Sequence, residues 1–394
     1  MTLPGNLRRR MLLPLLLTLG ILPLLTLCAP SARNESAADI VAALTDTLYS
    51  PRFASRFIII SSPDSARRVV STLRPWQGAG DVATRLLLLP EGERASSSDG
   101  NLKVLSGTPR RIICMSSTHV AMLDALGATD RIVGVSGLQY ITTPSLLSRK
   151  ESAPVDVGFD GNIDYESLAG ARPDLVLLSA ATGRSEMEGK LDELGIPYMY
   201  VGDYTESGPL GKSEWVVALG EVLGLRERGC EVIDSLAPLY TRWQMVAKEA
   251  SAVPKVLFNA PYSDAWMLPP DDSYMVRLVI DAGGVPVKGN PSDAARPVDM
   301  EEAYRLASQA DVWLNPGQAS DLSTLSAMAP RLKGSPLMSE GKVFNNNRLA
   351  IPGGGNPYFE RGVMQPDVVL ADLVTIFHPY LAPGRATVYY HPLK

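Results

Sequence analysis

Short apolar runs alternate with segments of helical spacing through most of the chain. The runs lack the in-and-out alternation of a strand with one exposed face. Such runs are typical of a parallel sheet that helices cover on both faces. We expect strands at 111–115, 132–135, 175–178, 198–201, 256–259, 312–314 and 342–345, and helices at 118–126, 163–169, 186–194, 212–223, 274–281, 300–307, 323–329 and 365–377.

One pattern within this alternation occurs twice. Residues 164–178 read DYESLAGARPDLVLL, and residues 299–314 read DMEEAYRLASQADVWL. In each copy a short helix with an acidic start leads to an aspartate and then to an apolar strand. The repetition predicts two similar α/β lobes, and two facing lobes form a cleft that can hold a small molecule.

A long helical segment separates the two copies. Its apolar residues recur at helical spacing between Cys230 and Ala247. At 1.5 Å per residue, the segment 227–250 would be about 36 Å long. Pro238 lies inside it and should kink or split the helix. We therefore expect a connecting helix at 227–251 between an N-terminal lobe at 109–226 and a C-terminal lobe at 252–394.

The N-terminus has the pattern of an export signal. Three arginines at 8–10 precede an apolar run at 11–27, which contains prolines and is short for a membrane span of about 20 residues. A signal peptide at 1–27 is therefore the favoured interpretation. The sequence LTLC at 25–28 resembles a bacterial lipobox, although leucine replaces the usual small residue before Cys28. We expect acylation of Cys28, and the alternatives are plain cleavage nearby or an uncleaved anchor.

The residues between the signal and the first lobe follow a different pattern. Residues 29–50 are polar and small and lead into a weak helix at 37–48. Three strand-like runs follow at 56–61, 68–73 and 85–89, and turn-rich stretches separate them. The segment 28–108 therefore reads as a lipoprotein tether followed by a small β appendage.

Composition excludes several classes of function. The chain is 45% apolar with a formal charge of −5, and it has only three histidines and three cysteines. Without clustered Lys and Arg, nucleic acid is not an expected partner. The scattered Cys and His residues do not predict a metal site. Neither a nucleophile elbow, a dinucleotide fingerprint nor a P-loop is present, so we expect no enzyme activity and no cofactor.

Ligands of open α/β sheets bind at the carboxyl ends of the strands. Aromatic rings in those loops offer flat apolar area, and arginine can meet an anionic group. A histidine at the start of the first helix could bind the same ligand, although a local hydrogen bond is the alternative. Glycines 353–355 suit a close approach of the backbone at a turn. The candidate ligand-binding residues are Tyr140, Tyr204, Tyr262, Trp266, Arg361 and His119. For Tyr262 and Trp266 the alternative is packing within the lobe, and for Arg361 it is a local turn or a pair with Glu360.

The order of these segments resembles the periplasmic binding proteins that serve ABC importers of vitamin B12, ferric siderophores and haem. The resemblance spans roughly 109–380. It rests on RIICM with HVAMLDALGATDRIVGVS, on PDLV, on KVLFN followed by Trp266, and on LVIDAGG and ADVWL. The tail PGGGNPYFERG with QPDVVLADLVTIFHP is close to that of Bacteroidota-type members. The resemblance implies two α/β lobes joined by one long helix, with a largely preformed cleft.

The resemblance also implies partners and a function. In that family one glutamate on each lobe pairs with arginines of the permease, and by motif position these are Glu166 and Glu301, with Glu302 as a competitor for the second. The alternative for each is a solvated glutamate at a helix start. The implied protein captures an iron–siderophore or similar metal chelate at the periplasmic side of the cell envelope and delivers it to the ABC transporter permease. A corrinoid or haem receptor of the same type is the alternative, and a chelatase-like enzyme is the alternative from another class.

Overall fold

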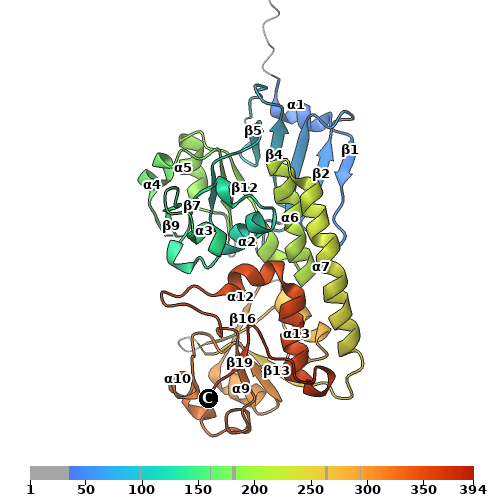
Figure 1. The fold of residues 1–394 in the computed structure, drawn as a ribbon, viewed down its shortest axis with the longest axis vertical. Coiled ribbons are helices and arrows are strands. Elements are labelled where there is room, and N and C mark those ends of the chain that lie inside the picture. Colours follow the sequence, from blue (N-terminus) through green and yellow to red (C-terminus); the bar gives the residue numbers. More distant parts are fainter. Residues whose placement is uncertain (1–34, 98, 160, 180–182, 262–264, 293) are drawn as a thin grey trace, which may run out of the picture. The chain divides into compact units, whose positions relative to one another are not determined.

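The computed structural model describes residues 35–394 except for 98, 160, 180–182, 262–264 and 293. Residues 35–394 form one compact unit (Figure 1). The predicted signal peptide at 1–27 and the predicted acylation site, Cys28, lie outside the described residues. Within the part that is described, no helix is long and apolar enough to cross a membrane.

The first lobe is built on a five-stranded parallel sheet in the order β12-β11-β6-β7-β8. Alternate residues of its central strands enter different core clusters. Ile112 and Cys114 of β6 face one cluster and Ile113 faces another, so both faces of the sheet are covered. The strands are β6 Ile112–Cys114, β7 Ile132–Val135, β8 Val155–Asp156, β11 Leu175–Leu178 and β12 Tyr198–Tyr200, with a small hairpin of β9 Gly158–Phe159 and β10 Asn162–Ile163. The helices are α2 Ser117–Ala125, η1 Thr129–Arg131, η2 Leu138–Tyr140, α3 Pro144–Leu147, α4 Tyr165–Gly170, α5 Met187–Glu193 and η3 Asp203–Thr205.

The second lobe repeats this arrangement. Its sheet has the order β15-β13-β17-β18-β19, and only β19 runs antiparallel to its neighbour among these paired strands. Trp313 of β17 faces one core cluster while Val312 and Leu314 face another. The strands are β13 Lys255–Phe258, β15 Val285–Pro286, β17 Val312–Leu314, β18 Val343–Asn345 and β19 His391–Pro392, with a separate pair of β14 Trp266–Leu268 and β16 Arg296–Val298. The helices are α8 Tyr274–Asp281, α9 Met300–Ala307, α10 Leu322–Met328, η4 Pro330–Leu332, α11 Pro336–Ser339, α12 Pro357–Glu360, η5 Arg361–Met364, α13 Pro366–Phe377 and η6 Pro379–Leu381.

The repeated sequence pattern has the same structural role in both lobes. An aspartate caps the start of each helix, since Asp164 accepts from the Ser167 amide and Asp299 accepts from the Glu302 amide. The aspartate after each helix then binds the start of the neighbouring strand. Asp174 accepts from the amide of Arg111 at 2.9 Å, before β6. In the second lobe, Asp311 accepts from the amide of Lys255 at 2.8 Å, in β13.

Three helices form the connection between the lobes. They are α6 Pro209–Leu223, α7 Arg226–Ala247 and α13, and α7 packs against both of the others. The expected split at Pro238 does not occur, because α7 is one continuous helix of 22 residues. Pro238 lies on the exposed side of α7, where water can take the place of the lost backbone hydrogen bond. At Gly229 a Cβ atom would lie 2.9 Å from the Val216 carbonyl oxygen, so glycine permits the close approach of α6 and α7.

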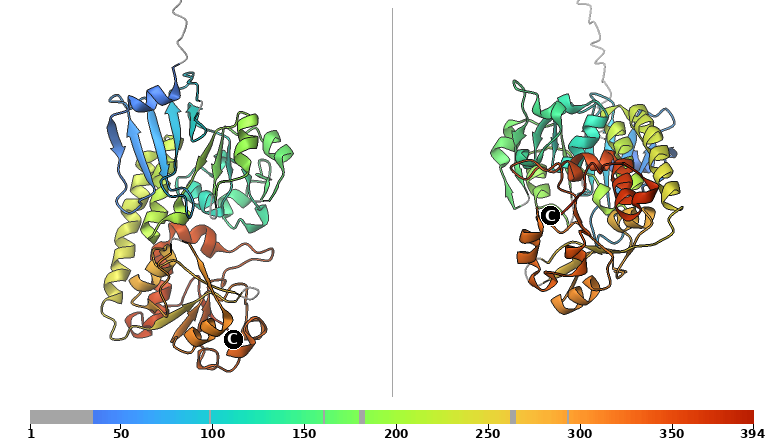
Figure 2. Two further views of the ribbon diagram at one scale, coloured as in Figure 1. Left: turned by 180° about the vertical axis from the view of Figure 1, so that it is seen from behind. Right: turned by 60° about the horizontal axis from the view of Figure 1, so that its bottom comes forward.

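The N-terminal segment forms a five-stranded sheet in the order β1-β2-β3-β4-β5 (Figure 2). The strands are β1 Asp46–Tyr49, β2 Phe57–Ser61, β3 Arg68–Leu73, β4 Ala83–Leu89 and β5 Leu102–Ser106, preceded by α1 Ala37–Ala42. One face packs under α1, and the other packs on α6, where Phe57 lies 4.9 Å from the Trp215 ring. The sequence predicted the three central strands but neither β1 nor β5.

Buried glutamates fasten this sheet to the first lobe. Glu214 of α6 accepts hydrogen bonds from the Tyr49 hydroxyl and from the amides of Arg52, Phe53 and Ala54, at 2.7 to 2.8 Å. Glu206 binds the next two amides of the same loop and the Trp215 indole. Because a buried carboxylate needs partners to remain charged, these bonds make the sheet an integral part of the lobe.

Candidate ligand-binding site

A cavity of about 330 Å³ lies where the two lobes meet. We call it the cleft cavity. The first lobe contributes the start of α2, η3 and the start of α6, which follow strands β6 and β12. The second lobe contributes α8 and the segment that leads into α13. This is the edge of the sheets at which the strand-end rule places a ligand, and the volume is within the range of small-molecule sites.

One charged side chain, Lys212, reaches this cavity among the described residues. Lys212 is nearly buried, and its Nζ atom donates to Asp203 Oδ2 at 2.8 Å. Burial, the largest single effect, lowers the pKa of Lys212, but the Asp203 carboxylate together with Tyr274 and Tyr204 outweighs it, and the pKa is raised. The lysine is therefore charged at neutral pH, and the carboxylate balances its charge.

Lys212 has capacity to bind a further group. An ammonium carries three N–H donors, and the described residues supply a hydrogen-bond acceptor for only one of them, on Asp203. The Nζ atom also lies 4.9 Å from the Tyr274 ring and 5.6 Å from the Tyr204 ring. These contacts hold the ammonium between two aromatic faces. An oxygen atom of a ligand in the cavity could accept from the remaining donors.

A histidine lies behind this ion pair. His119 is fully buried, and its Nε2 is 4.0 Å from Asp203 Oδ1. Neither ring nitrogen has a hydrogen bond of normal geometry within the described residues. Burial, with a smaller contribution from Lys212, lowers the pKa of His119 to about 4, although Asp203 and the Leu177 backbone oppose this shift. The ring is consequently neutral at pH 7, and it does not line the cavity.

The remaining polar groups of the cavity are hydroxyls. Tyr204 is 43% exposed, Tyr274 is half-buried, and Tyr358 is buried. Burial raises the pKa of both Tyr274 and Tyr358, so these phenols are protonated at neutral pH. The hydroxyl of Tyr358 lies 3.4 Å from that of Tyr390. Together with Met275 and Phe359, these rings give the cavity apolar walls with a few donors, which suits a ligand that is largely apolar.

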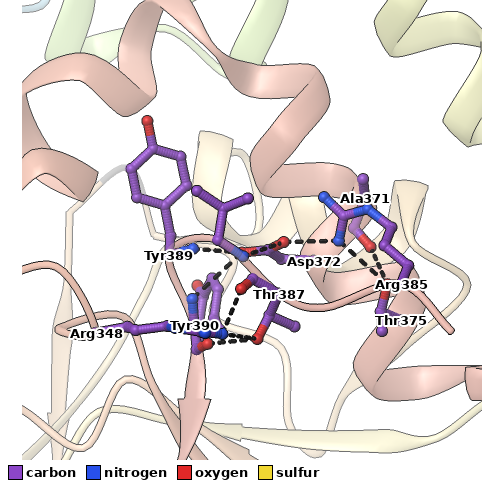
Figure 3. A network of polar contacts seen from close by, with 9 residues as sticks. Arg348, Ala371, Asp372, Thr375, Arg385, Thr387, Tyr389 and Tyr390 are labelled. Atoms are coloured by element: carbon purple, nitrogen blue, oxygen red, sulfur yellow. Dashed lines mark hydrogen bonds and ion pairs between the residues drawn. The ribbon is translucent and has the colours of Figure 1, made fainter.

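A network around Asp372 supports the second-lobe wall (Figure 3). The Asp372 carboxylate is fully buried and accepts from the amides of Val388, Tyr389 and Tyr390. It also forms an ion pair with Arg385 at 2.8 Å. The network thereby fixes the two C-terminal tyrosines, whose rings pack edge-on against Tyr358 at 5.9 and 5.6 Å.

The structure brings only part of the predicted ligand set to the cavity. Tyr204 lines it. Tyr140 is exposed at the end of η2 and lies beside Gly354, outside the lining. Arg361 starts η5, next to the lining residue Gly362, and its Nε atom is buried without a hydrogen bond in the described part of the chain. Tyr262 is outside the described residues.

Two predicted ligand residues are core residues in this structure. Trp266 is fully buried, donates from Nε1 to the Phe258 carbonyl at 2.7 Å, and packs against Trp313. Trp266 follows β13 in sequence, but the pairing of β14 with β16 turns it into the lobe. His119 is buried behind Asp203, as described above. We therefore leave both residues out of the candidate site.

The residues missed by the strand-end rule lie on helices. Lys212 is in the first turn of α6, and Tyr274 is the first residue of α8. The sequence did contain signals for these two residues, because Pro209 and the Ser273 cap mark the starts of their helices. Helices that follow parallel strands begin at the edge of the sheet where ligands bind. Phe359 lies after Asn356, which caps α12.

The two predicted docking glutamates are exposed. Glu166 lies in the first turn of α4 and Glu301 in the first turn of α9, and neither has an ion pair among the described residues. The competitor Glu302 differs, because it pairs with Lys288 and lies 3.5 Å from Arg305. The hydrogen bond from Lys288 lowers the pKa of Glu302. Of the two neighbours, Glu301 is thus the one available to a partner.

No group of three or more His, Cys, Asp and Glu side chains is arranged to hold a metal ion in the described part of the chain. The site consists of one compensated cation, several phenols and apolar walls.

Comparison with known proteins agrees with the fold. The periplasmic binding protein family matches residues 112–351. A protein of Methanocaldococcus jannaschii, called an uncharacterized lipoprotein, is 24% identical over 301 residues, which is 74% of this chain and 70% of that protein. The chain belongs to the periplasmic binding protein family, and it is a non-enzymatic transport receptor.

Solved structures show the same fold at low identity. A periplasmic heme-binding protein from Pseudomonas aeruginosa has a TM-score of 0.57 and 18% identity, with 73% of this chain and 98% of that chain covered. A structure of an ABC-type Fe³⁺-hydroxamate transport system from Saccharomonospora viridis has a TM-score of 0.53 and 16% identity, with 69% and 94% covered. The relative reported above is a protein of Methanocaldococcus jannaschii, and these findings do not support the expected Bacteroidota-type assignment.

Proposed function

We propose that this protein is the substrate-binding component of an ABC importer and that it captures an iron–siderophore or similar metal chelate in the cleft cavity. The observation that carries the proposal is the cavity itself, with its aromatic walls and a buried lysine that has unused donors. Aromatic rings pack on the apolar body of a chelate, and the lysine takes one of its oxygen atoms. The structurally similar proteins named for heme binding and Fe³⁺-hydroxamate transport support this class of cargo.

The charge of the cavity narrows the cargo further. Lys212 is its one charged lining residue among those described, and Asp203 already balances it. For a ligand with several negative charges, the free-energy cost of desolvation would therefore exceed the favourable interactions that this cavity offers. The cavity favours a chelate that is neutral or singly charged at its buried end.

A haem receptor of the same type is the second candidate. Haem iron takes an axial tyrosine in some proteins, and the hydroxyls of Tyr204 and Tyr274 have no hydrogen-bond partner among the described residues. Both rings lie beside Lys212 at the wall of the cavity. A band typical of phenolate-bound ferric haem would favour this candidate over a siderophore.

Delivery would use the two free glutamates. Glu166 and Glu301 occupy matching positions at the starts of α4 and α9. Arginines of a permease could pair with both, and such exposed pairs set orientation and rate of docking more than affinity. In this proposal the chain is held at the periplasmic side of the envelope through a lipid on Cys28, which the lipoprotein name of the relative supports.

The direct test is a binding experiment with defined probes. The soluble chain 29–394 is titrated calorimetrically with ferrichrome, haemin and cobalamin, and any ligand that copurifies is identified by its spectrum and mass. We expect saturable one-to-one binding of ferrichrome or haemin. If none of the three probes binds and nothing copurifies, the proposed cargo class is wrong.

A further inference from the structure

The segment between β18 and α13 leaves the second lobe and lies on the first. We call residues 346–365 the arm; it contains α12 and η5. The match to the periplasmic binding protein family ends at residue 351, within the arm. In the views of Figures 1 and 2, the arm runs from the second-lobe sheet to α12, beside the first lobe, and contacts of α12 and η5 with α2 establish the proximity.

A buried carboxylate anchors the arm. Glu360, the last residue of α12, is fully buried. One of its oxygens accepts from the amide of Thr142 at 2.6 Å and from the Thr142 hydroxyl. The other accepts from the amide of Thr143 at 3.2 Å and from its hydroxyl at 2.6 Å. Both threonines belong to the first lobe, just before α3, so these four bonds join the lobes across 217 and 218 residues of sequence.

Further contacts seat the arm along its length. The Ser213 hydroxyl of α6 donates to the Val363 carbonyl at 2.6 Å, and the Val363 side chain is part of the first-lobe core. Gly354 has a φ of +99°, and a Cβ atom there would lie 3.1 Å from the Tyr140 ring, so another residue would be strained at this position. This agrees with the prediction that glycines 353–355 permit a close backbone approach.

The anchored arm also forms a wall of the cleft cavity. Tyr358, Phe359, Gly362 and Val363 all line it. Phe359 stands out because its side chain is 54% exposed although it borders a cavity between two lobes. Its ring is held edge-on to Tyr358, with 5.1 Å between the ring centroids. An exposed, oriented aromatic ring next to a buried anchor is well placed to cover the apolar face of a ligand.

We propose that Phe359 is a specificity-determining residue that packs on a flat apolar face of the cargo, and that Glu360 is the positioning residue that holds it there. This inference rests on the proposed function, since it assigns a contact within the same cavity. It names the class of cargo as a chelate with an aromatic or otherwise flat apolar face. The arm then retains the bound cargo, and the effect of its loss falls mainly on the dissociation rate.

The anchor is tested first without any ligand, by hydrogen exchange of the full soluble chain. In the native protein, the amides of Thr142 and Thr143 and those of η5 are expected to exchange slowly. Glu360→Gln replaces an acceptor oxygen with a donor and should accelerate exchange there at least tenfold, by the free energy of bonds to a charged group. Equal exchange in the native chain and in Glu360→Gln would overturn the anchor.

The matched control is Glu214→Gln. Glu214 is also fully buried and also accepts four hydrogen bonds, but it holds the N-terminal sheet and not the arm. Its replacement should lower the melting temperature to a similar extent and leave exchange in the arm unchanged. If both variants accelerate exchange in the arm equally, the effect is general destabilisation and Glu360 has no positioning role.

The cargo contact is tested by stopped-flow dissociation of haemin, which has a flat apolar face, and of ferrichrome, which has none. Phe359→Ala should raise the dissociation rate of bound haemin on the order of tenfold and that of ferrichrome much less, and Phe359→Leu should restore part of the loss for haemin. Glu360→Gln should raise the same rate, whereas Glu214→Gln should not. Unchanged dissociation in Phe359→Ala would overturn the assignment. If the native chain binds neither probe, the proposed function fails, while the exchange experiment still decides the anchor.

Discussion

In the first lobe, the chain that leaves β12 enters α6 after a short turn, whereas in the second lobe the chain that leaves β18 crosses to the other lobe before it enters α13. Up to that point the lobes share four parallel strands in corresponding order and an aspartate at the start of a central strand. The shared part builds the scaffold. The departure builds the site, because the crossing segment supplies the wall that holds Phe359.

The largest expected effect tests whether the matching lobes share a docking role. Glu166→Arg with Glu301→Arg should reduce uptake of radiolabelled iron cargo through the importer to background, because like charges would meet at both contacts. Cargo affinity should not change, since neither residue lines the cavity. The control is Glu193→Arg with Glu249→Arg, which makes the same change in net charge at other exposed sites. Normal uptake in the Glu166 and Glu301 variant would refute the assignment.

Each lobe contains a fully buried histidine, which gives the second test. Burial lowers the pKa of both His119 and His378, and for His119 the value is about 4 against 6.5 for a free histidine. The unfolded chain therefore binds a proton more readily, and stability should fall as the pH decreases from 6.5 to 4. For His119 alone the loss is on the order of 3 kcal/mol.

Urea unfolding between pH 7 and pH 4 measures the loss of stability that each buried histidine causes. His119→Leu should flatten the dependence on pH, and His378→Leu should flatten a separate part of it. If the stability of His119→Leu falls as steeply as that of the native chain, another group is responsible for the acid sensitivity.

The two sides of the cavity are expected to differ in their contribution to affinity. Lys212→Gln made together with Asp203→Asn removes the buried charge pair without leaving one partner alone. The dissociation constant for the cargo should rise roughly tenfold to a hundredfold, since a hydrogen bond to a charged group is lost. On the second-lobe side, Tyr274→Phe removes one hydroxyl and should cost only a few-fold. Calorimetry that shows the reverse order would place the main polar contact on α8.

The smallest effect concerns the equivalent aspartates. Asp174→Ala and Asp311→Ala each remove hydrogen bonds to the amide at a strand start, and each should lower the free energy of unfolding by about 1 kcal/mol. Thermal unfolding of the two variants and of their combination provides the measurement. If only one of the two replacements lowers the free energy of unfolding, the repeated aspartate has a stabilising role in one lobe only.

The scaffold was predictable because its signals are local. Fully buried strands such as β11 are continuous apolar runs, and the repeated acidic pattern marks both lobes. The outer strands β1 and β5 were missed because much of each is exposed or half-buried, so their composition is mixed. Of the two outcomes expected at Pro238, a kink or a split, the split is wrong, since the pattern does not show which side of a helix faces water.

The site was less predictable because its contacts are distant in sequence. Tyr204 follows a strand and was found by the strand-end rule. Trp266 also follows a strand, yet a second strand pair turns it into the core. Glu360 was considered only as a partner for Arg361, and no local pattern connects it to the threonines of the other lobe, which lie 217 and 218 residues away. Such pairs are set by the tertiary fold.

The bonds of Glu206 and Glu214 to the loop before β2 have a consequence for anyone who shortens this protein. A chain that began at residue 109 would keep both lobes of the receptor but would strip α6 of its cover. Trp215 would face water, and two glutamates would lose the amides that now surround them. We expect such a fragment to aggregate, so a version of this receptor made to work with another importer must retain residues 35–108 together with both lobes.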